Sequence, residues 1–115
     1  MANASPHPNA ETVICHYRVR ADAEEQFREL LSRHWPTLRR LDAVTDEPAV
    51  IYRGQDDQSR LFIYEIFHWQ SAEAFQKAHA HPEVVAIWEP MAPLCESREG
   101  QPAMWFPHVE RLQLS

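Results

Sequence analysis

The sequence predicts an α+β domain in which an antiparallel sheet carries helices on one face and meets a second copy of the chain on the other. The first observation is residues 60–69, which read as a strand that is apolar on both faces. The second observation is the order of the elements, in which strands and helical stretches follow one another in a recognisable pattern. A strand that is apolar on both faces must be covered on both. Because one layer of helices covers only one face, we expect the subunit to form a homodimer through the other.

The chain begins with a strand and a helix. Residues 11–20 (ETVICHYRVR) alternate and are rich in β-branched and aromatic side chains, which favours a strand. Asp22 is a good N-cap, with Glu25 three residues later as in a capping box. Apolar residues then recur at helical spacing as far as Leu41. Pro36 lies inside this pattern and is expected to kink or break the helix, because it lacks an amide donor and clashes with the preceding turn.

A hairpin and a helix come next. Residues 49–53 and 60–69 read as strands, and the turn at 54–59 between them makes a hairpin. One face of the longer strand carries Leu61, Ile63, Glu65, Phe67 and Trp69, and the other carries Phe62, Tyr64, Ile66 and His68. Ser71 then caps a helix that runs as far as His79.

A second helical piece and a last strand complete the domain. Pro82 occupies a favoured first-turn position, and Pro90 and Pro93 end the helix that it starts. Residues 103–109 form the last strand, which lies at an edge or bends at Pro107. The resulting order, β-α-β-β-α-β, is the ferredoxin-like arrangement.

Length and charge limit the classes of partner. A chain of 115 residues is one domain, with a disordered polar tail at 1–10 and the folded part at 11–115. The net charge of -6 repels phosphate backbones, so no nucleic acid partner is expected. No basic amphipathic stripe or long apolar run points to a membrane. With no export signal we expect a cytoplasmic protein whose Cys15 and Cys95 are reduced thiols.

Cofactor and metal motifs are missing from the sequence. Two glycines in the whole chain leave no phosphate-binding loop, so we expect no bound cofactor. His79 and His81 have a spacing that places both side chains on one side of a strand but not of a helix. No third ligand follows at a clear spacing, so no metal site is predicted.

Glu65 is the sharpest anomaly, because it stands on an apolar face of the strand at 60–69. A buried carboxylate is costly unless it is paired. One interpretation is an ion pair across the sheet with an arginine such as Arg18 or Arg20. The other is an acid/base or ligand-orienting group, and the two interpretations are compatible.

Histidines and tryptophans supply the other candidates. His79 follows Phe75 by one turn on the same apolar stripe, so it is either a packed core residue or, near a carboxylate, a general base. His16 and His68 either line a pocket or contact the second copy. Four tryptophans indicate core and interface packing, or an aromatic wall for a planar ligand: Trp35, Trp69, Trp88 and Trp105.

The segment 64–79, YEIFHWQSAEAFQKAH, and its continuation HPEV at 81–84 resemble the antibiotic biosynthesis monooxygenase domain family. That family's pattern is roughly a strand ending Y-E-x-(W/F), then W-x-S-x-E-A-(F/L), then a helix histidine and a short turn similar to Ser/His-Pro-His. Glu65, Trp69 and His79 match it. The resemblance implies a dimeric α+β barrel with a ligand cleft between sheet and helices. It also implies kinship with cofactor-free oxygenases that convert phenolic polyketides to quinones.

The resemblance suggests roles for these residues. His79 would remove a phenolic proton, Glu65 would orient His79, Trp69 would stack on the ring, and Tyr64 would donate a hydrogen bond. The hypothesis therefore has His79 and Glu65 as catalytic residues and five substrate-binding side chains: Trp69, Tyr64, His16, His81 and Trp88.

Two other functions stay open. The chain is alternatively a non-catalytic dimer, of stress-response type, that holds a small hydrophobic ligand. A related branch of the family binds and degrades haem through a helix histidine and a first-strand asparagine. Here the ligand position falls near Trp88 and residues 13–20 contain no asparagine, which weakens that interpretation and leaves His79 or His81 as substitute ligands.

Overall fold

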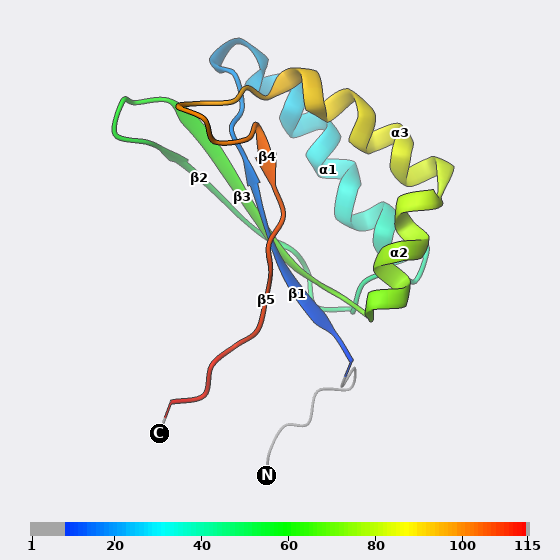
Figure 1. The fold of residues 1–115 in the computed structure, drawn as a ribbon. Helices are drawn as coiled ribbons and strands as arrows, with labels where there is room; N and C mark the ends of the chain where they lie inside the picture. The colour runs from blue at the N-terminus through cyan, green and yellow to red at the C-terminus, as the bar shows by residue number, and fades with distance from the viewer. Residues whose placement is uncertain (1–8, 115) are drawn as a thin grey trace.

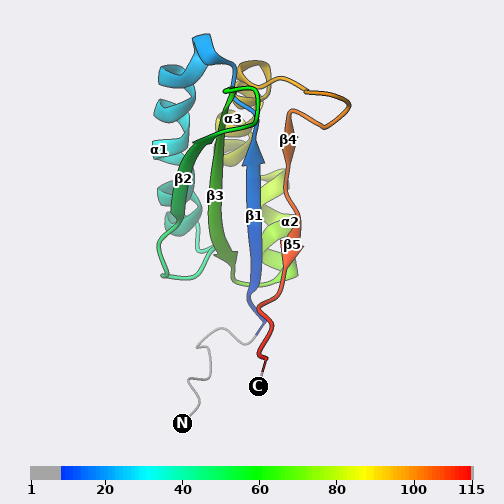
Figure 2. The ribbon, with the colours of Figure 1, turned by 90° about the vertical axis from the view of Figure 1, so that its left-hand side faces the viewer.

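The sheet is built on an antiparallel pair formed by the first and third strands. The computed structural model describes residues 9–114, so most of the predicted tail at 1–10 lies outside the described residues. β1 (Glu11–Tyr17) pairs along its whole length with β3 (Leu61–Trp69), and β2 (Val50–Gln55) pairs with the other edge of β3. The short strands β4 (Met104–Trp105) and β5 (His108–Val109) both pair with β1. The order across the sheet is β2-β3-β1-β4, with β5 also beside β1 (Figure 2).

Three helices cover one face of this sheet. α1 (Glu24–Arg40) connects β1 to β2, while α2 (Ala72–Ala80) and α3 (Pro82–Met91) follow β3. All three lie on the same side (Figure 1). The predicted α+β architecture is confirmed, with the second helical region divided into two helices and the last strand into two short pieces. None of the helices in the described part of the chain is long and apolar enough to cross a bilayer.

Side chains alternate along β1 and β3 between a buried and a half-buried face. The buried face packs against the helices, and burial of its apolar side chains stabilises the fold by about 25 cal/mol for each Å² removed from water. Glu65 belongs to this face and is 0% exposed. The helices contribute Phe27, Leu30, Leu31, Leu38, Val84, Ile87 and Met91 to the same core.

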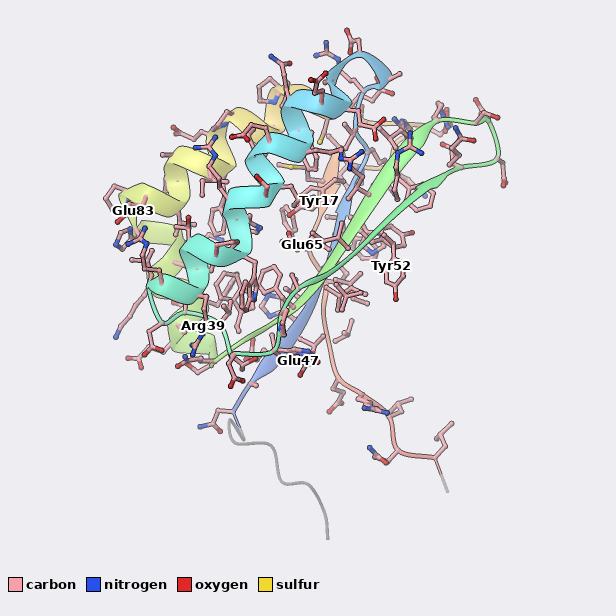
Figure 3. All side chains as sticks on the ribbon, turned by 180° about the vertical axis from the view of Figure 1, so that it is seen from behind. Tyr17, Arg39, Glu47, Tyr52, Glu65 and Glu83 are labelled. Atoms are coloured by element: carbon pink, nitrogen blue, oxygen red, sulfur yellow. The ribbon has the colours of Figure 1, made fainter. Side chains whose placement is uncertain are left out.

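The other face of the sheet has no helix over it within residues 9–114. Four ring side chains stand in register across four strands of this face, in the order Tyr52, Tyr64, His16 and Trp105. The ring centroids of His16 lie 4.5 Å from Tyr64 and 4.9 Å from Trp105. Figure 3 shows Tyr52 on this open side and Glu65 on the helix side. We call these four residues the aromatic row.

Two features of α1 differ from the sequence prediction. Pro36 does not break the helix, which runs unbroken from Glu24 to Arg40. Packing on both sides of the proline offsets the lost backbone bond, because Leu31 and Leu38 are both buried. Asp22 is not the N-cap of α1; its carboxylate accepts hydrogen bonds from the Arg20 guanidinium instead.

Candidate functional site

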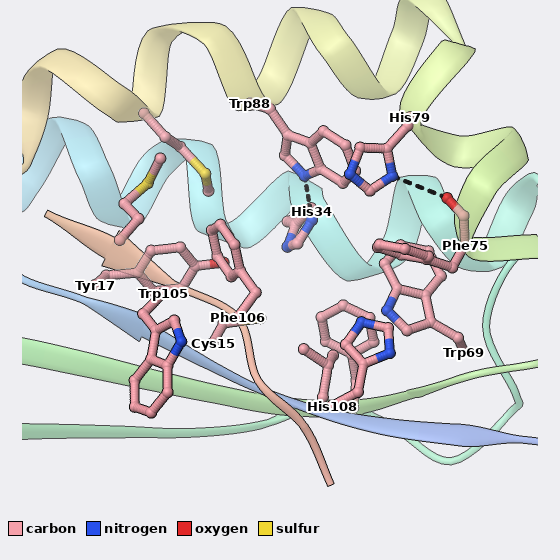
Figure 4. A pocket seen from close by; sticks show the side chains of 14 residues that line it. Cys15, Tyr17, His34, Trp69, Phe75, His79, Trp88, Trp105, Phe106 and His108 are labelled. Atoms are coloured by element: carbon pink, nitrogen blue, oxygen red, sulfur yellow. Dashed lines mark hydrogen bonds between the residues drawn. The ribbon is translucent and has the colours of Figure 1, made fainter. Parts of the chain in front are cut away.

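A cavity of about 490 Å³ lies between the sheet and the helices. Its size falls in the range of pockets that hold small organic ligands. Side chains from β1, β3, all three helices and the C-terminal strands form its wall, and most of them are apolar or aromatic (Figure 4). The lining residues are Val13, Cys15, Tyr17, His34, Phe67, Trp69, Phe75, His79, Trp88, Met91, Met104, Trp105, Phe106 and His108.

Glu65 lies one hydrogen bond behind this wall. The Tyr17 hydroxyl donates to Glu65 Oε1 at 2.9 Å, and His34 Nδ1 bonds the same oxygen at 2.9 Å. The prediction of an arginine partner is wrong, because Arg18 bonds Gln101 and a backbone carbonyl while Arg20 bonds an aspartate. Burying a tyrosine or a histidine beside the carboxyl group costs less desolvation free energy than burying the guanidinium of an arginine would.

The indole of Trp88 fixes the state of His34. Its Nε1–H donates to His34 Nε2 at 2.8 Å (Figure 4). Because an indole nitrogen can only donate, His34 Nε2 carries a lone pair and Nδ1 carries the proton. His34 therefore donates to Glu65. This series of hydrogen bonds runs from Trp88 through His34 to Glu65 and joins α3, α1 and β3, and we call it the buried chain.

Burial keeps two groups beside the buried chain in their neutral forms. It raises the pKa of the Tyr17 phenol well above its ordinary value, and the Glu65 carboxyl group raises it further. Burial also raises the pKa of the Cys15 thiol, and Glu65 adds to that effect. Tyr17 consequently remains a hydrogen-bond donor, and Cys15 is a poor nucleophile.

His79 stands at the mouth of the cavity, where it is exposed. Its Nδ1 lies 3.0 Å from the Phe75 carbonyl oxygen, which can only accept (Figure 4). Nδ1 thus carries a proton, and in the neutral ring Nε2 carries the lone pair. The ring packs edge-on against Phe75 and Trp88, with centroids 4.4 and 4.8 Å away. The expected contact with Glu65 is not formed, since Glu65 is bonded to Tyr17 and His34.

Trp69 supplies an unpaired donor to the same wall. The residue is buried, and its ring packs edge-on against Phe67 and Phe75. Among the described residues its indole Nε1–H has no hydrogen-bond partner. An unpaired buried donor is costly, and this N–H is closed to solvent as well.

The structure brings together some of the predicted site residues and not others. His79, Trp69 and Trp88 line one cavity, and Glu65 lies behind it. Tyr64 and His16 belong to the aromatic row on the open face of the sheet. His81 caps α3 by accepting from the Glu83 amide, and it lines a different hollow.

Sequence reasoning missed two histidines of the cavity. His34 shares the buried face of α1 with Leu30, Leu31 and Leu38. A polar residue on an apolar stripe is the signal that identified Glu65, and applied to α1 it identifies His34. His108 gave no such signal, because it belongs to a strand of two residues whose faces the sequence pattern does not define.

Metal ligands do not cluster in the described part of the chain. No group of three or more histidine, cysteine, aspartate or glutamate side chains among residues 9–114 has the geometry to hold an ion.

Comparison with known proteins identifies the fold. No family model matches the sequence, and no curated protein matches it either. A mutant of SnoaB, a cofactor-independent oxygenase from Streptomyces nogalater, matches with a TM-score of 0.70 at 16% identity, covering 92% of this chain and 96% of that one. A protein from Nitrosomonas europaea, described as a candidate antibiotic biosynthesis monooxygenase, matches with 0.64 at 14% identity, covering 90% and 91%.

A third solved structure shows the same arrangement in a protein known to pair. A dimeric ferredoxin-like protein of unknown function from Jannaschia sp. matches with a TM-score of 0.65 at 12% identity, covering 89% of this chain and 99% of that one. At such identities these similarities establish the fold. It is the ferredoxin-like α+β fold that SnoaB also has, as the resemblance at 64–84 predicted.

Proposed function

We propose that the cavity binds a small aromatic phenol or quinol and that the protein oxidises this ligand with O2 without a cofactor. The observation that carries the proposal is the combination of an apolar, largely aromatic cavity of about 490 Å³ with an imidazole lone pair at its mouth. The fold shared with a cofactor-independent oxygenase supports it.

Each part of the cavity has a task in such a reaction. His79 Nε2 accepts the proton of the ligand hydroxyl, and the resulting electron-rich anion reacts with O2 itself. One oxygen atom of O2 becomes a new carbonyl oxygen, and the other leaves as water with the two hydrogens that the substrate loses. The aromatic walls at Trp69 and Trp88 hold the ring and exclude bulk water.

Glu65 takes a structural part in this scheme. It holds Tyr17 and His34 in fixed positions, and both of these side chains form the floor of the cavity. A rigid floor keeps the ligand in one orientation toward His79. Glu65 thereby acts as a positioning residue through its neighbours.

We also propose that two copies pair through the aromatic row. The open face carries half-buried and exposed apolar side chains along all of its strands, and an exposed apolar surface of this kind marks an interaction site. His16 and Tyr64 would then contact the second copy and border the cavity only indirectly. The dimeric neighbour of the same fold supports this arrangement.

Oxygen uptake tests the reaction. Purified, metal-stripped protein is mixed with anthrones, naphthols and quinols in turn, and consumption of O2 is recorded with a Clark electrode. We expect uptake above the uncatalysed rate for at least one compound, and about a hundredfold loss in His79→Ala. His68→Ala is the matched control, because His68 bonds Thr12 and Glu47 away from the cavity. Equal rates with and without protein for every compound would refute the oxidation.

A second candidate function is ligand storage without turnover. The hydrogen-bond partner of His79 favours storage. This partner is the uncharged Phe75 carbonyl, which does not stabilise an imidazolium as a carboxylate would. Fluorescence quenching of the cavity tryptophans by the same compounds, without oxygen uptake, would support storage over oxidation.

A further inference from the structure

A second imidazole of the cavity is backed by a carboxylate. His108 lines the cavity, and its Nδ1 lies 2.9 Å from Glu11 Oε1. Strand pairing sets up this contact. Val13 is the residue of β1 directly opposite His108, so Glu11, two residues along the same face, is its diagonal neighbour.

The carboxylate determines what His108 can do. An ionised Glu11 only accepts, so Nδ1 carries the proton of a neutral His108 and Nε2 carries the lone pair. When Nε2 takes up a proton, Glu11 faces the new imidazolium and stabilises it, as the carboxylate of a catalytic triad does. His79 has no such support, because its Nδ1 donates to the uncharged Phe75 carbonyl.

Phe75 brings the two imidazoles to the same part of the wall. Its ring centroid is 4.4 Å from His79 and 4.6 Å from His108, and both imidazoles pack edge-on against it. Trp69, with its unpaired indole N–H, packs on the same phenyl ring at 5.3 Å. Two imidazoles and one indole therefore surround one aromatic side chain. Glu11 on β1 bonds His108 directly, and His79 on α2 packs against the same phenyl ring as His108.

We propose that the His108–Glu11 pair is a second proton acceptor of the cavity, which ionises the acidic hydroxyl of an aromatic ligand. The ligand O–H bond breaks, the proton bonds to His108 Nε2, and the electron pair stays on the ligand oxygen as a phenolate. Glu11 stays ionised throughout. The ligand class rests on the proposed function, but the proton transfer itself requires no O2.

The test uses 4-nitrophenol, whose phenolate is yellow and whose phenol is not. Protein and probe are mixed over a range of pH, and visible absorbance gives the ionised fraction of bound probe. The wild-type cavity should ionise it at a lower pH than free solution does. His108→Gln should weaken this ionisation about tenfold, one unit in the pKa of the bound probe. Glu11→Gln should weaken it about fivefold, the size expected for a half-exposed ion pair.

Matched variants locate the effect. His68→Gln removes another histidine paired with a carboxylate, Glu47, outside the cavity and should leave the ionisation unchanged. In His79→Gln, the bound probe should still ionise at a lower pH than in free solution, because His108 remains as a proton acceptor. If His108→Gln fails to fold, Glu11→Gln decides, since glutamine has nearly the same size as glutamate.

The outcomes separate this inference from the proposed oxidation. Wild-type protein that does not bind the probe, or unchanged ionisation in both His108→Gln and Glu11→Gln, overturns the dyad. Ionisation that depends on His108 without oxygen uptake from any substrate supports the dyad and refutes the oxidation. Oxygen uptake from a substrate, together with probe ionisation that is unaffected by His108→Gln and by Glu11→Gln, keeps the oxidation and overturns the dyad.

Discussion

Replacing Tyr17 with phenylalanine should cost roughly 2 kcal/mol of folding free energy. Tyr17 is 1% exposed, and its hydroxyl donates to the fully buried Glu65 at 2.9 Å. Phenylalanine fills nearly the same volume, so the substitution leaves no cavity and removes only the donor. A hydrogen bond to an ionised group contributes about 1.5–3 kcal/mol and one between neutral groups about 0.5–1.5 kcal/mol. Without the Tyr17 hydroxyl, His34 is the one remaining donor to the Glu65 carboxyl group among the described residues, because Glu65 Oε2 has no partner. The N–H of His34 already bonds Oε1, so it cannot replace the lost hydrogen bond.

Urea unfolding followed by circular dichroism measures the loss. All variants are compared at one protein concentration, because pairing of copies would make the midpoint depend on concentration. For a domain of this size 1 kcal/mol corresponds to about 4 °C, so the thermal midpoint should fall by about 8 °C. Because burial holds the pKa of Tyr17 well above its ordinary value, the difference should persist into mildly alkaline solution.

The matched control makes the same chemical change on the surface. Tyr52 on β2 is 58% exposed in the single chain. Tyr52→Phe keeps its ring in the aromatic row and should shift the free energy of unfolding by less than about 0.5 kcal/mol. If Tyr17→Phe is as stable as Tyr52→Phe, the hydroxyl contributes nothing and the account of the buried chain fails.

Three further predictions concern the open face, the thiols and pH. Val50→Asp should yield monomers in sedimentation velocity, whereas Ile51→Asp should not. The two residues are 46% and 48% exposed, but Val50 lies on the open face and Ile51 on the helix face. Equal behaviour of the two variants would refute pairing through the open face. Ellman's reagent should modify neither thiol of the folded protein in mildly alkaline solution. Burial raises the pKa of Cys95 to about 12 and the pKa of Cys15 well above its usual value. Rapid colour formation without denaturant would contradict this prediction. Burial, followed by the charge of Arg18, lowers the pKa of His16 below its ordinary value of 6.5, so the folded state binds this proton less readily than the unfolded state. Stability is therefore complete above that value and declines as pH falls below it, and His16→Gln should lose less stability on acidification than wild type.

The strands were the most predictable part of the molecule, because alternation along a sheet depends on local sequence. The assignment of Glu65 to a buried face followed from its neighbours at 63 and 67 alone, and the structure confirms it. Its partner was not predictable in the same way. His34 is on a different element, and only the packing of α1 on β3 decides that an imidazole meets the carboxyl group there. The continuation of α1 through Pro36 has the same cause, since tertiary burial outweighed a local preference.

The site was predictable where one continuous segment supplies it. Trp69 and His79 come from a stretch of eleven residues with a recognisable motif, and both line the cavity. His108 is contributed from the far end of the chain and meets Glu11 at its beginning. A contact between residues 97 positions apart in the sequence produces no periodic pattern from which it could be predicted.

The division of the chain between core and cavity wall has a consequence for how the cavity can change. The buried hydrophobic core is composed of residues 13–95, whereas Met104, Trp105, Phe106 and His108 contribute to the cavity wall without joining the buried core. The framework of the fold therefore depends little on these four residues. The short strands that carry most of them close one side of the ligand chamber by pairing with β1. Changes at positions 104–109 thus alter what the chamber accepts at little cost to the framework, which makes this strip the part of the chain most open to evolutionary retuning.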